Sequence, residues 1–159
     1  MPAHSPFNGR LHNHEDCIEN ALQAASDICS RQGLRFTPIR KRVLELVWSS
    51  HEPVAAYQLL KPLRKEKRNA EAPTVYRALD FLQQHGMVHK IESLNAYVGC
   101  DHPGEAHVSQ FLICTECKQI SEQESDSVSQ AIAREAQKSD FKVTGQVIEI
   151  NGVCARCRR

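Results

Sequence analysis

Two pairs of cysteines, each with two residues between its members, constrain this chain more than any other feature of its sequence. The pairs are Cys114–Cys117 and Cys154–Cys157. Zinc takes four ligands at the corners of a tetrahedron, and one tight Cys-x-x-Cys turn supplies two of them. Residues 118–153 separate the pairs, so intervening structure must bring them together. The spacing predicts a structural zinc site with these four cysteines as ligands.

The number and setting of the cysteines favour zinc over disulfides. Seven cysteines are an odd number, and residues 1–15 have no apolar stretch of the kind found in a secretory signal. Both features indicate a reducing compartment, and we expect a cytoplasmic protein. The alternative for a Cys-x-x-Cys pair is a redox dithiol, but that motif belongs near a βαβ pattern, which the sequence lacks.

Charge is unevenly distributed along the 159 residues, although the formal net charge is only +1. Residues 1–30 hold one basic and four acidic side chains, residues 31–90 hold twelve and five, and residues 91–159 hold seven and ten. The three blocks therefore carry −3, +7 and −3. A basic block of this size suggests a surface that faces phosphates, and its alternative is an ordinary solvated helical face.

Apolar residues at helical spacing predict two helices at the start of the first half. One runs over 16–31 and ends near Gly33. Thr37 followed by Pro38 is typical of a helix cap with a proline in the first turn, so a second helix is expected to begin there.

Two more helices are predicted before residue 90. The third starts at about Val54, and Pro62 inside its pattern is expected to kink or shorten it. The fourth starts at Pro73 and ends at Gly86, which is placed to act as a left-handed cap.

Two short strands, 87–92 and 96–100, are predicted after the helices. Helices followed by a two-stranded hairpin are the order of a winged helix-turn-helix, in which a short helix presents its N-terminal side chains to base edges in the major groove. The recognition helix is then 73–85. Arginine is the side chain that most often binds guanine in the major groove. For Tyr76, the alternative to a DNA contact is partial burial in the core. The candidate DNA contacts in this helix are Thr74, Tyr76 and Arg77.

The second half predicts a small α+β unit. Strands are expected at 110–114 and 119–124, then a helix at 126–138 and a third strand at 141–150 that leads into the second cysteine pair. With so few apolar residues, this unit is expected to need both zinc and a partner subunit. We therefore expect an obligate homodimer.

The fold class predicted is α+β, with an N-terminal winged helix-turn-helix followed by a small α/β dimerisation domain that zinc holds together. The predicted boundaries are a flexible tail at 1–15, the winged-helix domain at 16–92, the wing end and hinge at 93–107, and the dimerisation domain at 108–159. Weak metal binding by the histidines of the N-terminal segment is an alternative to a merely flexible tail.

These motifs resemble the ferric uptake regulator family, and within it the zinc uptake regulator branch, over about residues 18–157. The segments that carry the resemblance are 33–40 (GLRFTPIR), 72–82 (APTVYRALDFL) and 86–92 (GMVHKIE), followed by the two cysteine pairs. The resemblance implies a homodimeric, metal-dependent transcriptional repressor whose winged helix precedes its dimerisation domain. It also adds Tyr57, in a helix that the family uses near DNA, and Arg35 as candidate DNA contacts.

The resemblance further implies a regulatory zinc site that joins the two domains. Its ligands would be His89 in the first wing strand, Cys100 at the end of the second, His107 ahead of the first cysteine pair, and Glu122 in the strand after that pair. Nitrogen, sulfur and oxygen ligands in this combination form a tetrahedral set that zinc accepts. Taken singly, each of these side chains could be merely solvated. The rival ligands are Asp101, His102 and Glu124.

The function implied is that of a zinc-responsive repressor, with about two zinc ions per chain, whose zinc-loaded homodimer binds a palindromic operator in double-stranded DNA and represses zinc uptake genes. An iron-, manganese- or peroxide-responsive regulator of the same family is the alternative. The thiolate of Cys100 disfavours hard cations and so favours zinc.

Enzyme motifs are absent from the sequence. It lacks the His-x-Glu and Pro-Cys-x-x-Cys segments of zinc deaminases, a second histidine after His51-Glu52, a glycine-rich phosphate loop and a nucleophile elbow. It also has no run of eighteen apolar residues. We therefore expect neither an enzyme, nor a membrane protein, nor a small-molecule substrate.

Overall fold

The computed structural model describes residues 14–50, 52–105 and 107–158, which divide into two compact units on either side of residue 106. The histidines of residues 1–13 lie outside the described residues, whereas His14 and Glu15 already belong to the first helix. No helix in the described ranges is both long and apolar enough to cross a membrane.

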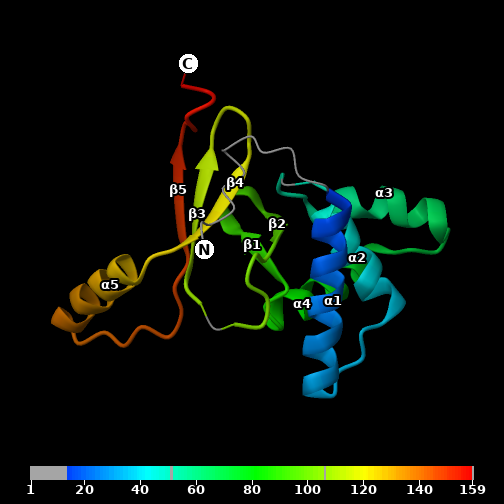
Figure 1. Cartoon of the computed structure of the whole chain (residues 1–159), viewed down its shortest axis with the longest axis horizontal. Coiled ribbons are helices and arrows are strands. Elements are labelled where there is room, and N and C mark those ends of the chain that lie inside the picture. Colours follow the sequence, from blue (N-terminus) through cyan, green and yellow to red (C-terminus); the bar gives the residue numbers. More distant parts are fainter. Residues whose placement is uncertain (1–13, 51, 106, 159) are drawn as a thin grey trace. The chain divides into compact units, whose positions relative to one another are not determined.

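The first unit opens with the four helices that the sequence predicts (Figure 1). Each contributes fully buried side chains to one core, including Ile28, Leu44, Leu59 and Leu79. The helices are α1 (His14–Gln32), α2 (Pro38–Trp48), α3 (Ala56–Glu66) and α4 (Ala72–Gln84).

The predicted helix ends are largely confirmed. Gly33 and Gly86 have φ angles of +65° and +66°, the left-handed conformation that ends a helix most easily when no Cβ is present. Thr37 is the N-cap of α2, with Pro38 in the first turn. Its side chain makes no capping hydrogen bond, so the cap depends on the Thr37 carbonyl, which accepts from Lys41 N at 3.0 Å.

The start of α3 differs from the prediction, and the helix continues beyond Pro62. Val54 precedes the helix and forms a β-bridge with Tyr97, with N···O distances of 2.9 and 2.8 Å. Pro62 does not end the helix, which continues to Glu66. Burial of Leu59 and Leu63, on either side of the proline, outweighs the lost backbone donor.

A hairpin completes the first unit as its wing. Strand β1 (Val88–Ile91) pairs antiparallel with β2 (Ala96–Gly99), and a short 3-10 turn, η2 (Glu92–Leu94), joins them. At Gly99 any Cβ would overlap the indole ring of Trp48 in α2. The wing and α2 therefore pack so closely that only glycine fits at this position.

Most of the predicted hinge at 93–107 belongs to the first unit. Residues 93–99 lie in the wing, and Gly104 packs against α1, because a Cβ built on it would be 3.0 Å from Ile28 Cδ1. The boundary between the units falls after Glu105, near the end of the predicted range.

The second unit is a three-stranded sheet with one helix. Strand β3 (Ser109–Cys114) lies in the middle, antiparallel to β4 (Ile120–Glu124) and parallel to β5 (Ile148–Gly152), as Figure 1 shows. Helix α5 (Asp126–Lys138) connects β4 to β5. The α+β class is thus confirmed.

The third strand of this unit starts later than the predicted range 141–150 and ends at Gly152. The observed strand β5 starts at Ile148, because the parallel pairing begins only where Gln110 of β3 faces Ile148. Helix α5 has no buried residue, and several apolar side chains of this unit are exposed. They are Val128, Phe141, Val147, Ile150 and Val153.

Candidate functional site

The recognition helix α4 presents one polar face to solvent and buries the other. Val75, Ala78 and Leu79 lie in the core, whereas Thr74, Tyr76 and Arg77 are exposed. Tyr76 is 48% exposed, so about half of its surface is open to contact and the other half is buried. All three candidate contacts lie in the first two turns of the helix, the part that meets base edges in helix-turn-helix proteins.

A cation–π contact fixes α4 against α2. The guanidinium of Arg40 lies over the ring of Phe81, 3.5 Å from its centroid, and also donates a hydrogen bond to the backbone carbonyl of Arg35. The guanidinium of Arg40 is therefore engaged in contacts within the first unit. The side chains of Arg35, in the loop before α2, and of Arg77, in α4, are exposed. A shallow pocket between the two helices has the lining Thr37, Ile39, Arg40, Thr74, Arg77 and Ala78.

Tyr57 stands in the first turn of α3 with 72% of its surface exposed. The side chain of Gln58 closes that end of the helix by accepting from the backbone N–H of Ala55 at 2.8 Å. An exposed tyrosine next to a fixed helix end suits contact with a ligand surface better than a role in the core.

The four cysteines of the two Cys-x-x-Cys pairs converge at one edge of the second unit. Their Sγ atoms all lie within 4.8 Å of one another, and those of Cys117 and Cys154 are 3.9 Å apart. A tetrahedron with Zn–S bonds of about 2.3 Å has sulfurs about 3.8 Å apart. The donor set therefore fits zinc, and none of the described cysteines is in a disulfide.

The thiols of this cluster differ in acidity in a way that suits a metal site. Backbone N–H groups of Cys154 and Cys117 hydrogen-bond to the sulfur of Cys114 and lower its pKa to about 6. The N–H of Cys154 is 3.4 Å from that sulfur. The pKa of Cys157 is raised to about 12, because its thiol hydrogen-bonds with Cys154 and because burial disfavours the thiolate. Without a cation the cluster keeps a proton that zinc would displace.

Two of the predicted regulatory ligands lie in the wing of the first unit. His89 is in the middle of β1, paired with Val98 of β2. Cys100 follows β2 directly, is buried, and donates its N–H to the carbonyl of Met87 at 3.1 Å. A ring nitrogen of His89 and the Sγ of Cys100 lie within 4.8 Å of each other. The hairpin register thus brings together one nitrogen and one sulfur ligand.

The other two predicted ligands lie together in the second unit. The Nε2 of His107 is 2.9 Å from Oε1 of Glu122. The same oxygen accepts a hydrogen bond from the hydroxyl of Ser109 at 2.5 Å, and Ser109 is itself buried. Glu124, the rival carboxylate, is exposed at the end of β4, and the rivals Asp101 and His102 of the first unit are exposed as well.

Ser109 is a residue of this site that the sequence did not single out. It lies on the same face of the β3–β4 ladder as Glu122, since Ser109 pairs with Glu124 and Phe111 pairs with Glu122. A serine in a strand carries no signal of its own. Only the alternation of the strand before a Cys-x-x-Cys pair, combined with the pairing register, could have indicated it.

A winged helix-turn-helix with an exposed recognition face, followed in the same chain by a four-thiolate centre, defines a class of winged-helix DNA-binding proteins that carry a metal. The model of the ferric uptake regulator family matches residues 31–151, and the chain belongs to that family.

Individual relatives support this assignment. The chain is 40% identical over 142 residues to the zinc uptake regulation protein of Escherichia coli (strain K12). The aligned region covers 87% of this chain and 82% of that protein. Among solved structures, it matches a zinc uptake regulator complexed with zinc and DNA with a TM-score of 0.82 and 39% identity, over 89% of this chain and 95% of the other. It also matches the structure of holo XcZur with a TM-score of 0.80 and 43% identity, over 87% of this chain and 97% of the other.

Proposed function

We propose that this protein is a zinc-responsive transcriptional repressor. Its zinc-loaded homodimer binds a palindromic operator and represses genes for zinc uptake. The observation that carries the proposal is the ligand pair in each unit: a nitrogen and a sulfur from His89 and Cys100 in the wing, and a nitrogen and an oxygen from His107 and Glu122 in the second unit. A zinc uptake regulator with a closely similar chain has been solved with zinc and DNA, which supports the same role here.

The two pairs together make the regulatory site of this proposal. Cys100 and His107 are close in sequence on either side of the boundary after Glu105. One zinc ion bound by all four ligands would tie the wing to the dimerisation unit, and so set the spacing of the two recognition helices in a dimer. Shifting such an equilibrium from almost fully open to almost fully closed takes about 5.5 kcal/mol of differential binding.

The structural centre has a separate role in the proposal. Cys114, Cys117, Cys154 and Cys157 hold zinc at the edge of the sheet, where it supplies the cross-link that a small core cannot. The exposed apolar side chains of the second unit then pack against a second copy of the chain. We therefore expect about two zinc ions per chain.

DNA contacts are assigned to the exposed face of the first unit. Arg77 donates a bidentate pair of hydrogen bonds to a guanine, while Thr74, Tyr76 and Tyr57 contact neighbouring bases and sugars. Arg35 contacts a phosphate. Two recognition helices related by the dimer axis read half-sites about one helical turn apart, or a multiple of it. The proposal includes a cytoplasmic location, no catalytic activity and no small-molecule substrate.

Gel-shift titration of a palindromic operator tests this function. The metal-free protein is titrated in turn with zinc, iron and manganese at fixed operator concentration. We expect zinc to produce the tight complex at the lowest free concentration, because the regulatory set includes the thiolate of Cys100. A complex that responds to iron or manganese but not to zinc would replace this function with that of an iron or manganese sensor of the same family. Sensitivity of the complex to peroxide would instead indicate a peroxide sensor.

A further inference from the structure

Positive charge is concentrated on α3 and on the turn after it, C-terminal to Tyr57. The side chains concerned are all exposed. We call them the α3 basic face; they are Lys61, Arg64, Lys65, Lys67 and Arg68.

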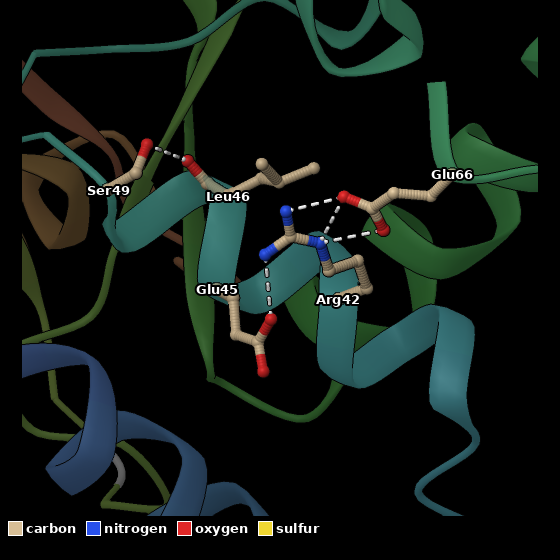
Figure 2. A network of polar contacts seen from close by, with 5 residues as sticks. All are labelled: Arg42, Glu45, Leu46, Ser49 and Glu66. Atoms are coloured by element: carbon tan, nitrogen blue, oxygen red, sulfur yellow. Dashed lines mark hydrogen bonds and ion pairs between the residues drawn. The ribbon is translucent and has the colours of Figure 1, made fainter. Parts of the chain in front are cut away.

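The charge of this face is not neutralised by any carboxylate among the described residues. Glu66 is the one acidic residue between Ala56 and Ala70, and it is bound by Arg42 of α2. Figure 2 shows the guanidinium of Arg42 between Glu66 and Glu45. The contacts to Glu66 measure 3.0, 3.0 and 2.6 Å, and that to Glu45 measures 2.9 Å. Within the described ranges, no member of the α3 basic face forms an ion pair with a carboxylate.

Backbone contacts hold this face in a defined shape. The N–H of Lys67 donates to the carbonyl of Leu63 at 2.8 Å, and the N–H of Ala70 donates to the carbonyl of Lys67 at 3.0 Å. Arg64 donates from Nε to the carbonyl of Ala70 at 3.1 Å and ties the turn to the helix. Since Leu63 is buried, the turn that carries Lys67 and Arg68 is anchored to the core.

The face continues the surface on which Tyr57 stands. Tyr57, Lys61 and Lys65 are four residues apart along α3 and therefore lie on one side of it. From Tyr57 to Lys65 the helix rises about 12 Å, which is roughly three to four base pairs of DNA. In helix-turn-helix proteins the first helix of the motif crosses the backbone, and α3 is that helix here.

We propose that the α3 basic face binds DNA phosphates beyond the base pairs that α4 contacts, and so extends the protein's footprint. This inference rests on the proposed function, because it assumes that α4 lies in the major groove of an operator. Lysine and arginine side chains without acidic partners release condensed counterions when they meet phosphates, and they do so without regard to base sequence.

A charge-removal variant tests the inference in the full-length, zinc-loaded protein. Lys61→Gln, Lys65→Gln and Arg68→Gln are combined, while the matched control combines Arg134→Gln, Lys138→Gln and Lys142→Gln in the second unit. Affinity for an operator duplex is measured by fluorescence anisotropy over a series of salt concentrations. We expect the magnitude of the slope of log affinity against log salt to fall by about 0.9 for each phosphate that is no longer neutralised, up to about 2.7 per chain and therefore about 5.4 for the homodimer. The control should keep the wild-type slope.

Two further readouts separate this role from base recognition. The variant should lose affinity by the same factor on operator and on random DNA, so that its preference for the operator is unchanged. Trimming the base pairs that flank the operator should weaken the wild type but leave the variant nearly unaffected.

Three outcomes would count against the inference or its premise. Equal salt slopes for variant and wild type would overturn the inference, and so would wild-type binding that is indifferent to trimming. A wild type that shows no zinc-dependent preference for the operator would overturn the proposed function instead.

Discussion

Cys114 and Gly152 pair in register across the parallel strands β3 and β5, and each is the last residue of its strand. Because parallel strands end at the same edge of a sheet, this pairing delivers the second cysteine pair to the first. The thiolate cluster is therefore a product of the sheet, even though residues 118–153 lie between its halves.

Replacement of Cys114 by serine should cost the second unit its structural zinc. The cluster loses the thiol whose pKa is lowered to about 6, and structural zinc contributes about 10–16 kcal/mol to folding in small metal domains. We expect a metal content lower by one ion per chain and loss of the dimer, measured by metal analysis and analytical ultracentrifugation. Cys17→Ser, outside the cluster, is the control. A dimeric, fully folded Cys114→Ser protein would show that the cluster is not structural.

Replacement of Cys100 by serine should have a different result. Cys100 belongs to the first unit and the four-cysteine cluster to the second, so we expect a folded dimer that keeps its structural zinc. Zinc-dependent operator binding should be lost, because the regulatory set loses its thiolate. Gel shifts across a zinc series measure this, with metal content as the control. Wild-type operator affinity in this variant would remove Cys100 from the switch.

Arg77→Ala should weaken operator binding by about 1–3 kcal/mol, because alanine cannot donate the bidentate pair of hydrogen bonds to guanine. Binding to random DNA should change much less. Anisotropy measurements on both duplexes give the comparison, with Arg134→Ala in α5 as a control of equal charge. If both affinities fell equally, Arg77 would be a phosphate contact.

Ser109→Ala should lower the affinity of the regulatory site for zinc by about 10–100-fold, the usual cost of losing an outer-shell hydrogen bond to a metal ligand. The hydroxyl of Ser109 donates to Oε1 of Glu122, the oxygen that also contacts His107. Competition titrations with a zinc chelator measure the affinity, and Ser109→Thr should restore it by keeping the hydroxyl. An Ala variant with unchanged zinc affinity would make Ser109 a strand residue without influence on the metal.

Gly99→Ala should lower the free energy of unfolding by about 1–3 kcal/mol, since overpacking forces neighbouring groups to shift. The new Cβ would overlap the indole ring of Trp48, so the wing or the indole must move. Chemical denaturation of the zinc-loaded protein measures the change. At Gly145 a Cβ meets nothing within 4 Å, so Gly145→Ala should be close to neutral.

Local signals in the sequence located most helices and all four cysteines of the cluster. Predictions failed where distant segments decide the outcome. Val54 looked helical but is held as a β-bridge by Tyr97, and β5 starts at Ile148 because that is where β3 can pair with it. Pro62 is expected to kink or shorten α3, and the helix continues past it to Glu66, with the buried Leu59 and Leu63 on either side.

The sequence by itself determined which side chains are available for chemistry: thiols at zinc spacing, a basic block, and Arg77 in the first turns of a helix. Tertiary structure alone decided which of the positive charges meet an aromatic ring or a carboxylate and which, among the described residues, stay exposed without an acidic partner. Arg40 is held over Phe81 and Arg42 is held by Glu66, whereas Arg77 and the α3 basic face remain exposed. The physical reason is that an ion pair or a cation–π contact depends on the packing of helices far apart in sequence, and spacing along one helix does not encode that packing.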